Sequence, residues 1–174
     1  DLNGSHYEVP TSFNKIGVNY HTNFVIDSGE TVEIILQKVP KSNFPFISSE
    51  YAYNVIYKVD GSENSDDHAK DMPELLKILS TVALSVKAFI SDHKDESIIF
   101  FASDDNVSKR KQKFRFYNTV FDQIVPNDFY KNVYNIHGME VFYMRPMTDK
   151  EKISEERGAI LTEYLLKKYK TNAQ

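Results

Sequence analysis

The longest regular pattern of apolar residues lies near the middle of the chain. Its members are Leu75, Leu79, Val82, Val86 and Phe89. They recur every three or four residues, which is the spacing of one face of an α-helix. Asp71 stands three residues before Glu74, with Pro73 between them, a combination typical of a helix N-terminus. The pattern therefore predicts a helix over residues 72–93 with one buried face.

Two further elements follow this helix. Residues 97–102 form a short apolar run without alternation, which predicts a strand covered on both faces. Beyond it a second helix is predicted over residues 107–125, ending before Pro126 because helix is disfavoured at the residue preceding a proline. Its inward stripe is predicted to consist of Phe114, Tyr117, Phe121 and Ile124.

The N-terminal part of the chain alternates apolar and polar residues, as half-buried strands do. Strands are predicted over residues 18–26 and 31–38, paired as an antiparallel hairpin around Gly29. A third strand is predicted over residues 51–59. Its Tyr-rich face, composed of Tyr51, Tyr53, Val55, Tyr57 and Val59, is expected to be an exposed surface for interactions.

The C-terminal part is predicted to contain strands over residues 131–136 and 140–144, joined around Gly138, and a last helix over 149–169. Its inner face is predicted to carry Ile153, Leu161, Tyr164, Leu165 and Tyr169. The order β-β-β-α-β-α-β-β-α predicts an α+β fold, a mixed and mostly antiparallel sheet with helices packed on its faces. With 174 residues, we expect one domain over 7–174, preceded by a tag remnant or flexible N-terminus over 1–6.

Composition narrows the possible functions. The chain has no cysteine, which excludes a disulfide scaffold and a cysteine nucleophile. No apolar run reaches the ~20 residues that a membrane-spanning helix needs. The net charge of -4 argues against a general attraction to nucleic acid. The five histidines lack the spacing of metal ligands, and the common nucleotide-binding and hydrolase motifs are missing, so no metal or catalytic site is predicted.

Two charged clusters are candidate binding residues. Asp104 and Asp105 follow the apolar strand of residues 97–102, where a carboxylate pair either binds a cation or caps the next helix, and capping is favoured. A basic cluster consists of Lys109, Arg110, Lys111, Lys113 and Arg115. It suits a solvated helix face, phosphate contacts or docking on an acidic protein, and we expect docking.

Three stretches of the central region stand out together: Leu79-Ser80-Thr81-Val82, residues 98–103 and residues 113–117. Through them the chain resembles a group of small, poorly characterised proteins from tailed bacteriophages. In the last of these, Lys113 stands in place of an arginine and Phe116 in place of a leucine. The match covers about residues 73–144 and implies a phage origin.

The same order of elements looks like the second half of the acetyltransferase (GNAT) superfamily. That resemblance implies acetyl-CoA as the cofactor and Tyr117 as the general acid that protonates the departing thiolate. The superfamily's glycine-rich loop, whose amides hold pyrophosphate, is replaced here by His68-Ala69-Lys70-Asp71-Met72-Pro73. We therefore expect the cofactor site to be lost, with no cofactor bound.

Together these features predict a non-catalytic, phage-encoded interaction protein, either a virion component or a protein that binds a host target. We expect its partner to be another protein of the phage or the host, and its location to be the virion or the host cytoplasm. A homo-oligomer is compatible with this hypothesis. The first alternative is an acyl-CoA-dependent N-acyltransferase that uses Tyr117, and the second is nucleic-acid binding through the basic helix.

Overall fold

The computed structural model describes residues 5–43, 51–61, 71–102, 107–125, 127–136 and 139–172. Its elements are β1 (Asn14–Ile16), β2 (Asn19–Val25), β3 (Thr31–Pro40), the 3-10 turn η1 (Lys41–Asn43), β4 (Tyr51–Val59), α1 (Met72–Asp92), β5 (Ile98–Ala102), α2 (Val107–Ile124), β6 (Phe129–Ile136), β7 (Met139–Pro146) and α3 (Asp149–Asn172). Each predicted helix and strand is present within a few residues of its expected bounds. The sequence analysis missed β1 and η1.

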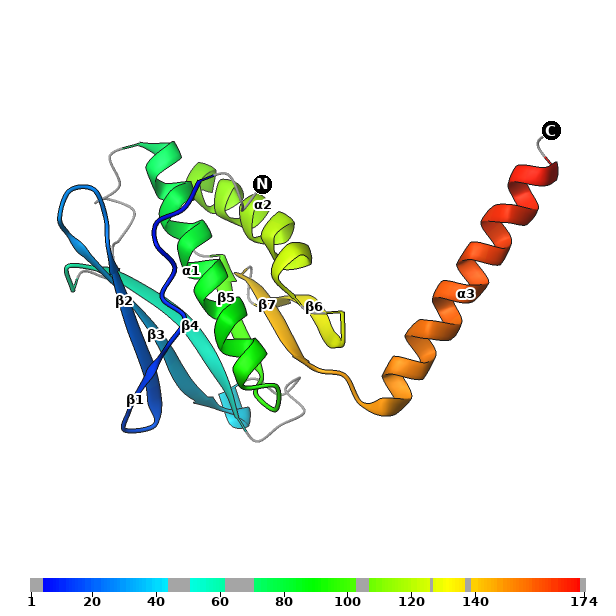
Figure 1. The fold of residues 1–174 in the computed structure, drawn as a ribbon, viewed down its shortest axis with the longest axis horizontal. Coiled ribbons are helices and arrows are strands. Elements are labelled where there is room, and N and C mark those ends of the chain that lie inside the picture. Colours follow the sequence, from blue (N-terminus) through cyan, green and yellow to red (C-terminus); the bar gives the residue numbers. More distant parts are fainter. Residues whose placement is uncertain are drawn as a thin grey trace.

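The strands of the described residues form one seven-stranded sheet in the order β1-β2-β3-β4-β5-β7-β6 (Figure 1). Neighbouring strands are antiparallel except β4 and β5, which are parallel and are connected through α1. A parallel pair needs such a crossover, whereas antiparallel neighbours need only a turn. At the turn between β2 and β3, Gly29 has a φ of 87°, which suits glycine. The predicted α+β class with a mixed, mostly antiparallel sheet is confirmed.

One face of the sheet forms the main core with α1 and α2. Val32, Ile34 and Leu36 alternate along β3 and are fully buried there. Val82 and Val86 of the predicted helix face and Phe121 of the predicted α2 stripe are each no more than 6% exposed in this core. Ile99 and Phe101 of the predicted strand over 97–102 are expected to be buried as well; Ile99 is, whereas the side chain of Phe101 lies outside the described set.

Aromatic rings attach α2 to the same face. Phe100 stacks on Phe142 with ring centroids 4.9 Å apart, and Phe121 meets both rings edge to face at 5.6 and 5.3 Å. Such edge-to-face and offset arrangements add to the stabilisation from burial alone. The inward stripe predicted for α2 is thus confirmed for Phe121, while the side chain of Ile124 is outside the described set.

The opposite face of the sheet carries a smaller cluster made of Ala52, Ile99, Val141 and Tyr143. Ile98 and Ile99 are both fully buried although they point to opposite faces of the sheet. The prediction that this apolar strand is covered on both faces is therefore confirmed at these two positions.

Two expectations about exposure are wrong. The Tyr-rich face of β4 is turned inward: Tyr53 and Val59 are buried, and Val55 and Tyr57 pack against the main core. Alternation shows which residues share a face, but not which face the helices cover. Val18, the first residue of the strand predicted over 18–26 and expected to share a face with Phe24 and Ile26, is 57% exposed, because β2 begins only at Asn19.

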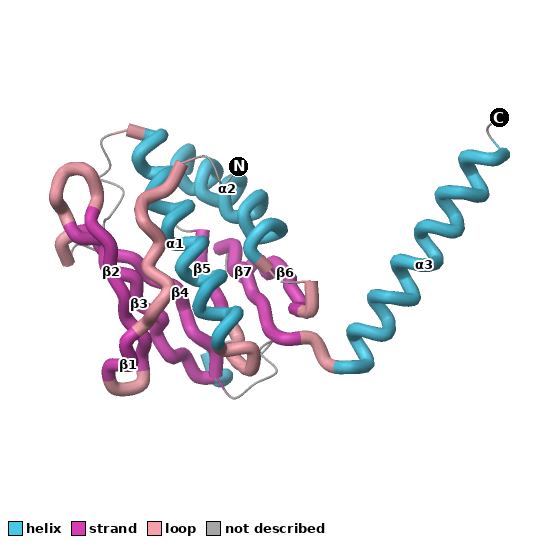
Figure 2. The backbone as a smooth tube through the Cα atoms, viewed as in Figure 1, coloured by secondary structure: helices cyan, strands magenta, loops and turns pink. Residues whose placement is uncertain are grey.

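The third correction concerns α3, which does not pack on the sheet. It leaves the body after β7 and extends away from it (Figures 1 and 2). Ile153, Leu161, Tyr164 and Leu165, predicted to lie on an inner face, are all exposed. The side chain of Tyr169 is outside the described set. Among the residues that the structure describes, no helical segment combines the length and hydropathy of a bilayer-spanning helix.

Candidate functional site

The exposed apolar residues of α3 form the candidate site. Five of them, Ile153, Ile160, Leu161, Tyr164 and Leu165, are here called the α3 stripe. Their exposed fractions lie between 40% and 68%. At 100° per residue they fall within an arc of about 140° on the helix surface. Leu166, 66% exposed, falls on the opposite side of the helix. Single exposed apolar residues are ordinary, but a group of them on one side of a helix favours a surface that binds something.

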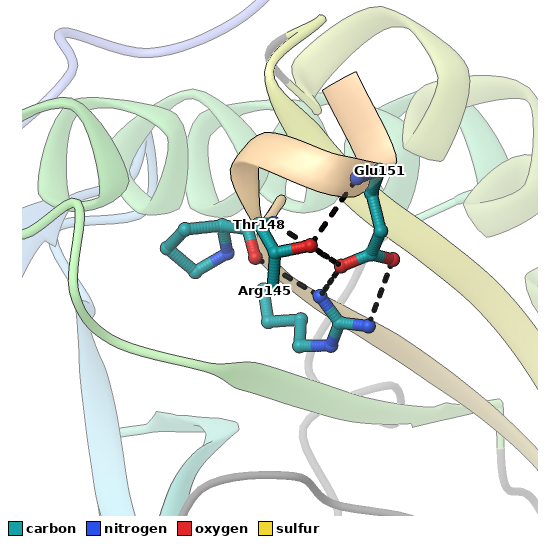
Figure 3. A network of polar contacts seen from close by, with 4 residues as sticks. Arg145, Thr148 and Glu151 are labelled. Carbon is teal, nitrogen blue, oxygen red and sulfur yellow. Dashed lines mark hydrogen bonds and ion pairs between the residues drawn. The ribbon is translucent and has the colours of Figure 1, made fainter. Parts of the chain in front are cut away.

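A capping box holds the first turn of α3 (Figure 3). The Thr148 hydroxyl accepts a hydrogen bond from the Glu151 amide at 3.2 Å, and Glu151 Oε1 accepts one from the Thr148 amide at 3.1 Å. Two amides at the helix end, which have no partner within the helix, are thereby satisfied. The spacing of Thr148 and Glu151 is visible in the sequence, and the structure shows that the box forms.

Arg145 ties this capping box to the sheet. Its guanidinium donates to both carboxylate oxygens of Glu151, at 2.7 and 3.0 Å, in the two-pronged geometry that makes arginine–carboxylate pairs strong (Figure 3). It also donates to the Pro146 carbonyl at 3.1 Å and lies over the Tyr130 ring of β6, 4.4 Å from its centroid. The start of α3 is therefore fixed to β6 and β7, and these contacts set the direction in which the helix leaves the sheet.

The link shifts the pKa of both partners. The hydrogen bonds from Arg145, followed by the one from the Thr148 amide, lower the pKa of Glu151 to about 2. The same pairing with Glu151 raises the pKa of Arg145 above its ordinary value. Both side chains remain charged across the physiological pH range, so the link persists there.

The predicted basic cluster lies on α2, and its members differ in exposure. Lys111 and Arg115, one turn apart, are exposed, whereas Arg110 and Lys113 are half-buried. The side chain of Lys109 is outside the described set, and so are Asp104 and Asp105 altogether. Phe114 packs against the core 5.8 Å from the Phe142 ring, so the aromatic residues of α2 are turned away from the exposed cations. Lys111 and Arg115 therefore form an exposed basic surface on α2.

Tyr117, the residue that the acetyltransferase resemblance makes a general acid, is a half-buried residue at the edge of the core. Its ring meets those of Phe100 and Phe142 edge to face, at 5.5 and 5.9 Å. Five residues from α2, β5 and β7 thus form one aromatic cluster: Phe100, Phe114, Tyr117, Phe121 and Phe142. The ring of Tyr117 is therefore part of the packed core.

The N-terminus of α1 is closed by the chain itself. The Asp71 side chain accepts a hydrogen bond from the Glu74 amide at 2.9 Å, as predicted from the sequence. Pro73 has no amide hydrogen to offer. A carboxylate therefore occupies the position where an anion would bind at a helix N-terminus, and its negative charge opposes phosphate there.

The sequence analysis missed two features of the site, the role of Arg145 and the exposure of α3. The sequence gives no sign of the first, because contact between residues 145 and 151 depends on the angle at which α3 leaves the sheet. A sign of the second was present: Ile153 is the only large apolar residue between Asp149 and Ala159. A helix that packs on a core carries several apolar residues over such a length.

A scan against protein-family models, a search of curated proteins and a search of solved structures each found nothing that matches this chain. In the described residues, no group of three or more His, Cys, Asp or Glu is placed to hold a metal ion.

Proposed function

We propose that this chain is a non-catalytic interaction protein of phage origin, a virion component or a binder of a host target, which engages another protein molecule, either a different protein or a second copy of itself, through the α3 stripe. The observation that carries the proposal is the exposure of apolar residues along a helix that the Arg145–Glu151 link holds away from the body. Amphipathic helices presented in this way bind apolar surfaces through residues spaced three and four apart.

The energetics of the α3 stripe favour association. Removing apolar surface from water contributes about 25 cal/mol per Å². Because α3 is already helical and fixed at its first turn, binding does not have to order the helix at the same time, which reduces the entropic cost of association. The exposed cations Lys111 and Arg115 supply a second contact, one suited to an acidic protein surface.

Affinity capture from infected cells tests the proposal with a matched pair of variants. Leu161→Glu places a charge in the α3 stripe, whereas Leu166→Glu makes the same change on the opposite side of the helix. We expect wild type and Leu166→Glu to retain the same partner, and Leu161→Glu to retain at least about tenfold less, because burying an unpaired carboxylate costs more than the 1.4 kcal/mol that a factor of ten represents. Equal capture by all three proteins would contradict the proposal.

The second candidate function is an acyl-CoA-dependent N-acyltransferase, and a specific observation favours it. The succession β4, α1, β5, α2, with Tyr117 on α2, is the order of elements on which the acetyltransferase resemblance rests. The capped N-terminus of α1 and the packed ring of Tyr117 argue against a working site. Saturable acetyl-CoA binding in a calorimetric titration, weakened by Tyr117→Phe, would decide for the enzyme.

Nucleic-acid binding through α2 ranks third. The chain is acidic overall, with a net charge of -4, and the aromatic residues of α2 are packed inward, where they cannot stack on bases.

A further inference from the structure

The α3 stripe is an exposed apolar surface, and the geometry of α3 indicates which binding partner covers it. The helix has 24 residues, which gives a length of about 36 Å at 1.5 Å per residue. Taking the proposed function as its basis, we propose that the occupant is the α3 helix of a second copy of this chain, packed antiparallel in a two-fold symmetric dimer. A two-fold axis pairs the same surface with itself, so a single exposed stripe is sufficient.

One pair of charges beside the stripe favours the antiparallel arrangement. Glu156 and Lys167 lie eleven residues apart, about three helical turns, and therefore on the same side of the stripe. With the two-fold axis between Leu161 and Thr162, each Glu156 faces the partner's Lys167. Lys167 is also paired within its own helix with Glu163, at 3.1 Å, and stays 77% exposed. A parallel pair would instead place Glu156 beside Glu156 and Lys167 beside Lys167, which is repulsive.

Gly158 fits the same arrangement. Glycine inside a helix lowers helix stability relative to alanine. Nothing in the described chain requires it here, because a Cβ built at Gly158 would meet no atom within 4 Å. In the antiparallel pair Gly158 lies opposite the partner's Leu165, where the missing side chain leaves room for the larger one. The pairing thus gives this glycine a packing role.

The extension of α3 keeps the two bodies apart. The proposed axis lies about 13 residues from Thr148, or about 20 Å along the helix. The capping box and Arg145 fix the first turn of α3 to the sheet, and the helix extends away from the body (Figure 1). In the proposed pair, each body therefore stays at its own end. The middle of α3 is therefore accessible to a second copy.

Sedimentation equilibrium of the full chain tests the pairing. We expect wild type and Leu166→Glu to be dimers in the micromolar range, and Leu161→Glu to dissociate at least about 100-fold more readily, since the dimer would bury two added carboxylates. Thermal melting of the body should be the same in all three proteins, because Leu161 and Leu166 are both exposed. A monomeric wild type at 100 µM, or a dimer that Leu161→Glu leaves intact, would overturn the proposal.

The orientation is tested by single cysteines, which are unambiguous because the chain has none of its own. In the antiparallel pair Leu161→Cys lies beside its counterpart and should form a disulfide-linked dimer on mild oxidation. Ile153→Cys should not, because the two copies of residue 153 would be about 25 Å apart and a disulfide needs Cα atoms within about 7 Å. Linkage at both positions would show a parallel pair and overturn the antiparallel assignment.

The two proposals fail separately. If the wild type is monomeric but partner capture is still lost in Leu161→Glu, the second-copy proposal fails and the proposed function stands. If Leu161→Glu alters neither self-association nor capture, both proposals fail.

Discussion

At the scale of single residues, Glu151 carries the most informative chemistry in the described chain. Its ordinary pKa of about 4.3 falls to about 2 in the folded protein. A carboxylate with a lowered pKa stabilises the fold at pH values above its unfolded pKa, and this contribution is lost as the pH falls towards the folded pKa. We therefore predict that the first turn of α3 stays capped at pH 5 and frays between pH 4 and 2. Carbon-detected NMR titration of the Glu151 carboxyl, with amide exchange in that turn, measures this.

The variant Glu151→Gln separates charge from shape at this position. It keeps the size of the side chain but loses the ionic part of its pairing with Arg145. We expect amide exchange in the first turn to become several-fold faster, about 1 kcal/mol for a partly exposed pair. Glu8→Gln, at an exposed glutamate outside α3, serves as the control and should leave the exchange unchanged. An unaltered exchange rate in Glu151→Gln would mean that Thr148 alone holds the turn.

At the scale of elements, α1 and α3 should respond oppositely to the same kind of substitution. Val86 on α1 is 3% exposed within the main core, whereas Leu161 on α3 is 57% exposed. We predict that Val86→Asp unfolds the domain, since an unpaired buried charge costs several kcal/mol and whole domains are stable by only about 5–15 kcal/mol. Leu161→Glu should leave the melting temperature of the body unchanged. A soluble, cooperatively melting Val86→Asp protein would place the core on another face of α1.

The same contrast explains how far the sequence could predict these elements. The bounds of α1 depend on local chemistry, the Asp71 cap and the apolar repeat, and they were predictable to within a residue. Four of the five residues of the α3 stripe were predicted to share one face, but a shared face shows only that a helix has an apolar side, not what covers it. The expectation that the Tyr-rich face of β4 is exposed was wrong for the same reason. Its alternation is correct, and its orientation depends on where α1 and α2 pack.

At the scale of the whole molecule, the positions of the charged residues say more about where a partner binds than the net charge does. The chain has a net charge of -4, yet Lys111 and Arg115 present an exposed basic surface on α2, a helix that packs on the body and not on α3. If α3 pairs with a second copy, α2 is the surface left for a different protein. A dimer then presents two such basic surfaces and binds a repeated acidic target more tightly than one copy does.

This arrangement predicts that the charge on α2 controls the rate of association and not stability. The double reversal Lys111→Glu and Arg115→Glu should change the free energy of unfolding by no more than about 0.5 kcal/mol, because both side chains are exposed. It should slow association with the captured partner about tenfold at low salt and flatten its dependence on salt. The single reversal Lys87→Glu, at an exposed lysine on α1, is the control and should have a much smaller effect. Association rates of the three proteins are measured by surface plasmon resonance between 20 and 500 mM salt. Identical dependences of the association rate on salt for all three proteins would mean that Lys111 and Arg115 only form a solvated helix face. Binding of wild type to random DNA with comparable affinity would favour the nucleic-acid hypothesis.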